Sequence, residues 1–170
     1  NACQRQVAPK PQSKKISHFR KQKSFSRLSA IGHVDIKLNA VKKGSSVTLI
    51  GDSRDVPEVE TKVVNGQLLL NANLRHSLHA PLTAIVNTPV LNEVRFVGFG
   101  DIKAKNFKAQ SFDLFLKNKG NVNLAGKIGL RKLNVKGSAN VTIKGVSSRA
   151  LEIDMKDSPN VKLEGVANLE

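Results

Sequence analysis

The sequence contains no tryptophan and no tyrosine, and its aromatic residues are 7 phenylalanines among 170 residues. Proteins that bind single-stranded nucleic acids stack the bases on aromatic side chains, and such stacking platforms are scarce here. No recognisable nucleic-acid-binding motif is present either. We therefore expect no nucleic acid as a partner.

Acidic residues are also few, with 13 Asp and Glu against 28 Lys and Arg, which gives a formal net charge of +15. A balance this basic favours anionic partners or surfaces. No apolar run reaches the length of about 18 residues that a transmembrane helix requires. A chain of 170 residues is long enough to bury a core of its own.

Cysteine occurs once, at Cys3, so the sequence offers no internal disulfide. The basic, polar segment 1–24 predicts a flexible tether before a single domain at residues 25–170. A cysteine followed by such a tether resembles the mature end of a bacterial lipoprotein, in which the cysteine carries the lipid. By the same resemblance, Gln4 in place of Asp favours the outer membrane. The alternative is an incidental thiol.

The region 91–170 repeats itself. Four similar segments, 94–104, 114–124, 133–143 and 153–163, begin 20, 19 and 20 residues apart. Apolar residues alternate in each segment around a small corner rich in Gly, Asn and Asp, which predicts two short strands joined by a turn. A period of this length is typical of a solenoid. We therefore predict an all-β β-solenoid with coils of about 20 residues.

The first ninety residues are less regular. The pair Asn65-Gly66 lies between two strand-like segments, which predicts an antiparallel hairpin near the N-terminal half. An ordinary meander of hairpins is the alternative for the repeats, but the repeating corner favours stacked coils.

Two sets of polar residues recur at equivalent positions of the repeats. Asp101, Asn121, Asn140 and Asn160 occupy one corner position, where we expect a structural ladder of hydrogen bonds; a ligand-binding row is the alternative. Two outward columns hold lysines: the first contains Val97, Lys117, Lys136 and Lys156, and the second contains Lys103, Asn123, Thr142 and Lys162.

Like charges on neighbouring strands repel each other, by a few tenths of a kcal/mol or more per pair. Columns that tolerate this repulsion predict binding of an anionic polymer or surface, such as lipopolysaccharide, an acidic glycan or lipid headgroups. The alternative is a solvated face that keeps the protein soluble and discourages edge pairing.

Signs of catalysis and of metal binding are weak. Asp35, Asp101, Asp113 and Asp154 are candidate carboxylates, but the repeat gives no reason to bring two of them to the spacing of a glycosidase. His76 and His79 are three residues apart, and a metal site would need further ligands. We therefore predict no catalytic residue, no metal and no cofactor, with the histidines in a solvated loop. A polysaccharide-processing β-helix enzyme is the alternative.

Several segments, in this order, resemble one known family. They are Phe25-Ser26-Arg27-Leu28, the run from Ile31 to Ile36, Asn65-Gly66-Gln67-Leu68, and Thr88-Pro89-Val90-Leu91-Asn92-Glu93-Val94 leading into Gly98-Phe99-Gly100-Asp101-Ile102. This layout is similar to the family of putative auto-transporter adhesin head (GIN) domains, over residues 25–170. Phe99 departs from the small residue usual at its corner.

The resemblance implies a right-handed β-helix-like domain of bacterial envelope proteins, often lipoproteins, and it implies no catalytic residue. Together with the residues, it predicts a non-enzymatic lipoprotein of the cell envelope, facing the periplasm or exposed on the outer membrane. Such a protein would be adhesin-like or act as a scaffold. Self-association through the ends or edges of the solenoid is a further expectation.

Overall fold

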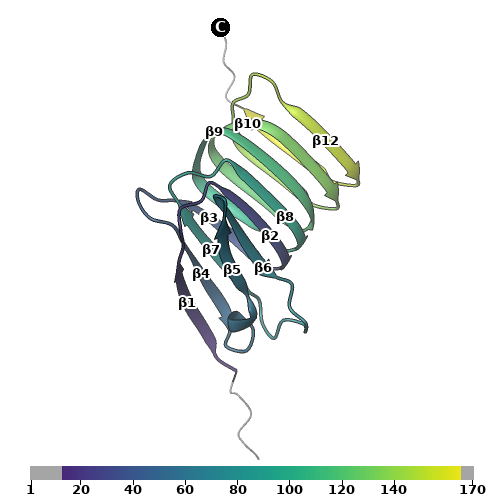
Figure 1. Ribbon diagram of the computed structural model, residues 1–170. Helices are drawn as coiled ribbons and strands as arrows, with labels where there is room; N and C mark the ends of the chain where they lie inside the picture. The colour runs from purple at the N-terminus through teal and green to yellow at the C-terminus, as the bar shows by residue number, and fades with distance from the viewer. Residues whose placement is uncertain (1–12, 166–170) are drawn as a thin grey trace, which may run out of the picture.

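The computed structural model describes residues 13–165, and most of them lie in β-strands. Thirteen strands form a single mixed sheet, which curls along its length (Figure 1). The one helical element among the described residues is the short 3-10 turn η1. The prediction of an all-β fold is therefore confirmed.

The elements follow one another along the chain with these bounds: β1 Lys15–Lys21, β2 Arg27–His33, β3 Asp35–Ala40, β4 Ser46–Asp52, η1 Val56–Glu58, β5 Glu60–Val64, β6 Gln67–Ala72, β7 Thr83–Thr88, β8 Glu93–Phe99, β9 Ile102–Lys119, β10 Asn121–Gly137, β11 Asn140–Val146, β12 Glu152–Asp157 and β13 Asn160–Gly165.

The C-terminal half is built from parallel strand pairs. Ile102 pairs with Val122, Val122 with Val141, and Val141 with Val161, so residues 20, 19 and 20 positions apart lie side by side. The first part of β9 also pairs with β3 and its last part with β8. Between these parts Asn106 has a positive φ of 53°. The long strand therefore joins two parts of the curled sheet.

The N-terminal half adds antiparallel pairs to the parallel ones. β4 lies between β1 and β7 and is antiparallel to both. β5 and β6 form the predicted hairpin, with Asn65 and Gly66 at positive φ values of 50° and 73° in its turn. β2 and β3 run parallel to β8 and β9 and connect this half to the repeats.

Part of the predicted tether belongs to the sheet. Lys15–Lys21 forms β1, which pairs with β4 over its whole length, and the Arg20 Nη2 atom donates a hydrogen bond of 3.1 Å to the carbonyl oxygen of Val56. Cys3 lies outside the described residues, so its lipidation stays a prediction. No helix in the part of the chain that the structure describes has the length and apolar character needed to cross a membrane.

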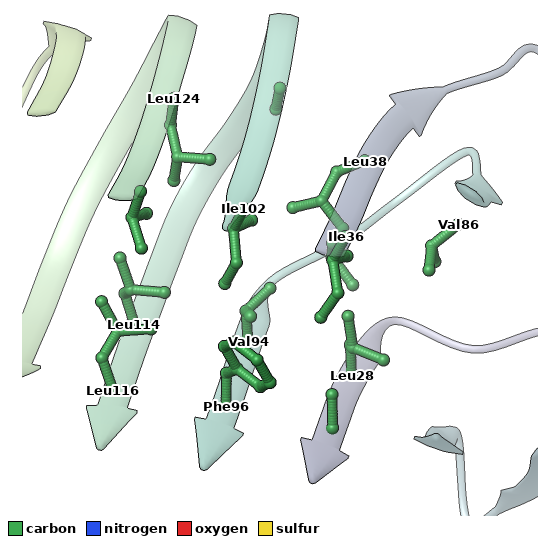
Figure 2. Close-up of a cluster of buried hydrophobic side chains, with 14 of the residues drawn as sticks. Leu28, Ile36, Leu38, Val86, Val94, Phe96, Ile102, Leu114, Leu116 and Leu124 are labelled. Carbon is green, nitrogen blue, oxygen red and sulfur yellow. The ribbon is translucent and has the colours of Figure 1, made fainter. Parts of the chain in front are cut away.

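The core lies between the two parts of the curled sheet. Leu28, Val94 and Leu114 come from neighbouring strands of one part, and Ile36 and Ile102 come from the other. All five are buried, and Figure 2 shows Ile36 and Ile102 next to Leu28 and Val94. Burying such a side chain contributes about 1.5–3 kcal/mol. Because alternate residues face this core, the residues between them face outward.

Candidate functional site: a lysine row beside an apolar groove

The strand register brings together the first predicted lysine set. Val97 pairs with Lys117, Lys117 with Lys136, and Lys136 with Lys156, on the adjacent parallel strands β8, β9, β10 and β12. Neighbouring strands lie about 4.8 Å apart, so the stems of these side chains run side by side. Lys117 and Lys156 are exposed and Lys136 is partly exposed. We call Lys117, Lys136 and Lys156 the lysine row.

The row carries positive charge with little compensation. Among the ion pairs of residues 13–165, the one lysine involved is Lys162, whose Nζ atom lies 3.3 Å from Oε1 of Glu164. Lys119 adds a further exposed cation two positions after Lys117 on β9. Asp154, two positions before Lys156 on β12, is an exposed acid on this strand. The row thus keeps three cations free for an anion.

The second predicted set is more dispersed. Lys103 and Lys162 belong to one register position of the other part of the sheet, but Asn123 and Thr142 separate them. The sequence reasoning missed Lys37, which pairs directly with Lys103 through β3. Lys37 and Lys103 lie on two adjacent strands, whereas the lysine row extends over three.

A surface groove of about 570 Å³ lies at the β8 end of the lysine row. Its walls include Ile31, Val97 and Phe99 from β2 and β8, and Leu74, His76 and Leu78 from the segment 73–82. Val97 and Phe99 are 50% and 58% exposed. Since Val97 is also the register partner of Lys117, apolar surface and positive charge adjoin each other.

The sequence reasoning did not predict this groove, because the segment 73–82 has no periodic pattern from which its position could be inferred. One signal was present. Phe99 stands at a corner where a small residue is usual, and the structure places it on the groove wall with an edge-to-face contact to the His33 ring at 6.1 Å between centroids.

The corner residues form a chain of hydrogen bonds. The Asp35 Oδ1 atom accepts a bond from the Asp101 N–H at 2.8 Å, and the Asp101 Oδ1 atom accepts one from the Asn121 N–H at 2.8 Å. Farther along, Asn140 donates through Nδ2 to Asn121 Oδ1 at 3.1 Å, and Asn160 to Asn140 Oδ1 at 2.9 Å. These contacts hold successive repeats together and include Asp35, which the repeat alignment did not contain.

Three of the four candidate carboxylates, Asp35, Asp101 and Asp113, are engaged in structural contacts, whereas Asp154 is exposed. Asp113 is buried, and its Oδ1 atom accepts a hydrogen bond of 3.0 Å from Arg131 Nε. Its register partner Glu93 accepts one of 3.2 Å from Arg95 Nε. The pair Glu93 and Asp113 is thus neutralised by arginines, an arrangement that gives no specific support to a glycosidase.

The two histidines meet a buried carboxylate that the sequence reasoning did not connect with them. Asp55 precedes η1 and is 0% exposed, and its Oδ1 atom lies 2.7 Å from Nδ1 of His79. Its Oδ2 atom accepts a hydrogen bond of 2.8 Å from the His79 backbone N–H. Burial raises the pKa of Asp55, but the hydrogen bonds from His79 outweigh this effect and hold the pKa below its ordinary value.

Comparison with known proteins adds to this picture. The family described as "Putative auto-transporter adhesin, head GIN domain" matches residues 24–169. No curated protein matches the chain.

Among solved structures, the chain is similar to a "Putative lipid binding protein" from Parabacteroides distasonis, with a TM-score of 0.73 and 20% identity. The similarity covers 89% of this chain but 66% of that one, so this chain spans just under two thirds of that protein.

Two further structures span similar shares of this chain. A "putative cell adhesion protein" from Clostridium sporogenes has a TM-score of 0.63 and 12% identity, over 90% of this chain and 100% of its own. A "putative adhesin" from Bacteroides fragilis has a TM-score of 0.58 and 17% identity, over 90% and 98%. At these identities the similarity concerns the fold alone.

Proposed function

Because this chain belongs to the family described as "Putative auto-transporter adhesin, head GIN domain", we propose that it is a non-enzymatic, adhesin-like module of the bacterial cell envelope that binds an anionic lipid surface. The observation that carries the proposal is the continuity between the lysine row and the apolar groove, through the register pair Val97 and Lys117. The similarity in fold to the "Putative lipid binding protein" from P. distasonis supports it.

The chemistry of the two surfaces fits one amphipathic ligand. Ammonium groups on adjacent strands repel each other by a few tenths of a kcal/mol or more, and phosphate groups placed among them relieve this repulsion. Exposed Val97 and Phe99 gain free energy when an acyl chain covers them, at roughly 25 cal/mol for each Å² of apolar surface. A lipid with an anionic headgroup supplies both contacts, whereas an acidic glycan supplies the first alone.

The envelope location and the architecture belong to the same proposal. The parallel pairing of residues 19 or 20 positions apart supports coils of about 20 residues, and we propose that these coils wind as a right-handed β-helix. A lipid on Cys3 would hold the module at a membrane, with part of the basic segment 1–24 acting as the tether. The exposed Ile153 and Met155 on β12, which pairs with one other strand, support self-association with a second copy.

Vesicle co-sedimentation tests the lipid proposal. The soluble chain carries Cys3→Ser and is mixed with vesicles of phosphatidylcholine alone or with phosphatidylglycerol. The row variant is K117Q/K136Q/K156Q. The control K42Q/K43Q/K62Q removes the same charge from exposed positions in the N-terminal half. We expect the row variant to bind the anionic vesicles at least about tenfold more weakly, because it loses three direct phosphate partners, and the control to lose much less.

Equal losses in the two triple variants would show that net charge alone drives binding, and would overturn the assignment to the row. The variant Phe99→Ser separates lipid from glycan. It should weaken binding to anionic vesicles but leave retention on immobilised polygalacturonate unchanged. Binding of the wild-type chain to polygalacturonate without binding to the vesicles would replace the lipid with an acidic glycan.

A further inference from the structure

Asp55, His76 and His79 form a cluster of possible metal ligands, and one of them, His76, lines the apolar groove. One possible ligand atom from each of the three residues lies within 4.8 Å of the other two. The Asp55 Oδ1 atom is 2.7 Å from His79 Nδ1 and 3.8 Å from His76 Nδ1, and the two imidazole ring centroids are 5.1 Å apart. We propose that these three residues bind a divalent transition metal of the Zn²⁺ class.

The donor set selects the class of metal. Two imidazole nitrogens and one carboxylate oxygen suit Zn²⁺, Ni²⁺ or Cu²⁺, whereas Mg²⁺ and Ca²⁺ prefer sets made of oxygen alone. Ligand atoms around a four-coordinate Zn²⁺, with bonds of about 2.0–2.2 Å, lie roughly 3.3 Å apart. The distances of 2.7 and 3.8 Å bracket this value. Replacing the proton shared by Asp55 and His79 with a metal therefore requires the Asp55–His79 and Asp55–His76 distances to change by about half an ångström. The ligand nitrogens of the two imidazoles, which lie within 4.8 Å of each other, must approach by up to about 1.5 Å.

The protein holds the carboxylate firmly and leaves the imidazoles accessible. Asp55 is fully buried at the start of η1, and its second oxygen is fixed by the His79 backbone N–H. Both histidine side chains are partly exposed, so a hydrated ion can reach them from solvent. Three protein ligands leave a fourth position for water.

The site would connect two segments that the sheet does not join. Asp55 follows β4, whereas both histidines lie in the segment 73–82 between β6 and β7, which contains no strand. His76 also lines the apolar groove. A metal at this position would therefore fix one wall of the groove. The binding of metal does not depend on the lipid proposal.

Calorimetric titration of the untagged full chain with ZnCl₂ tests the site, with Cys3→Ser in every sample to remove a competing thiol. The single variants are His76→Ala and His79→Ala, and the matched control is His18→Ala, an exposed histidine on β1. We expect one Zn²⁺ per chain. Each single variant should bind Zn²⁺ at least about tenfold more weakly, since loss of an outer partner alone commonly costs 10–100-fold.

Zn²⁺ should also raise the melting temperature of the wild-type and His18→Ala chains, because a ligand that binds the folded state stabilises it. Mg²⁺ should not. His76→Ala is decisive, because the His76 ring makes no hydrogen bond to a buried side chain in the described structure, and the variant is expected to fold normally. The proposal is overturned if the wild-type chain binds no Zn²⁺, or if His76→Ala and His18→Ala bind it equally well.

Discussion

The Asp101 Oδ1 atom accepts a hydrogen bond of 2.8 Å from the backbone N–H of Asn121, which lies 20 residues farther along the chain. Asp101 thus links the second repeat to β3, because its own N–H donates to Asp35. At the next two contacts of this corner, asparagine side chains bond each other instead. The corner residues consequently act as clamps between adjacent strands of the parallel ladder.

Replacing Asp101 tests this clamp. Asp101→Ala removes the acceptor of the Asn121 N–H and should lower the free energy of unfolding by about 1 kcal/mol. Asp101→Asn retains an oxygen at the same position, as Asn121 and Asn140 do, and should cost less than about 0.5 kcal/mol. Urea denaturation of both variants measures the difference. Equal destabilisation would indicate that the charge of Asp101, and not its oxygen, stabilises the corner.

Gly145 and Gly44 provide a matched pair for measuring close packing between strands. Their φ values are +83° and +84°, so an alanine meets similar backbone strain at either position. A Cβ atom on Gly145 would lie 1.7 Å from the carbonyl oxygen of Gly126, whereas one on Gly44 meets nothing within 4 Å. Gly145→Ala should therefore destabilise the protein by at least about 2 kcal/mol more than Gly44→Ala.

The comparison can be read from thermal unfolding followed by circular dichroism. A similar loss in Gly145→Ala and Gly44→Ala would contradict the close approach of β11 to β10, since backbone strain alone would then explain both results.

Asp113 and Arg131 form an ion pair between a buried carboxylate and an exposed guanidinium group. The Asp113 side chain is buried while Arg131 is largely exposed, and the carboxylate holds the pKa of Arg131 above its ordinary value. Arg131→Met leaves the buried carboxylate without this partner and should lower the free energy of unfolding. Adding Asp113→Asn should recover part of that loss. A double-mutant cycle from urea denaturation measures the coupling, and strictly additive losses would contradict it.

Asp52 should make the stability of the protein depend on pH in the acidic range. Hydrogen bonds from the Arg54 side chain at 2.9 and 3.0 Å, together with the Arg54 backbone N–H, hold the pKa of Asp52 well below its usual range. As the pH falls, the Asp52 carboxylate of the unfolded chain is protonated near pH 4, whereas that of the folded chain is protonated at a lower pH. The stabilisation is therefore complete above about pH 4 and is lost as the pH falls below it.

Asp52→Asn should consequently be less stable than the wild type at neutral pH, and the difference should shrink towards about pH 2. Urea denaturation of both proteins at several pH values measures it. Since the other carboxylates are common to both chains, a difference that stays constant with pH would contradict the assigned pKa.

The repeats could be predicted from the sequence because the alternation of apolar and polar residues along each strand indicates which side chains are buried. Ile102, Val122 and Val141 face the core on successive strands, and the same period places Lys117 beside Lys136. β1 could not be predicted in this way. Its Phe19 is 63% exposed, and Ile16 is its one side chain packed against the core, so the strand has no alternating apolar pattern. Its backbone pairs with β4 over the whole strand.

The apolar groove and the histidine cluster depend on contacts without a period. His79 lies 24 residues from Asp55, and the segment 73–82 that carries it follows the surface without a strand of its own. The spacing of these residues in the sequence does not predict that they are in contact. The path of an irregular loop depends on the surface that the loop packs against. The groove wall formed by Leu74 and Leu78 could not be predicted from the sequence for the same reason.

The strand register also bears on the order in which the chain can fold. Pairs within the C-terminal half join residues 18 to 20 apart, whereas β2 pairs with β8, and β3 with β9, across 66 residues. Closing the longer loops costs about 1 kcal/mol more in chain entropy. During synthesis, β2 and β3 leave the ribosome long before β8 and β9 exist. Before then, β2 can pair with β6 and β3 with β7, but the opposite edge of each strand stays unpaired. Nascent chains stalled before residue 93 should therefore be cleaved by proteases more readily than the complete chain.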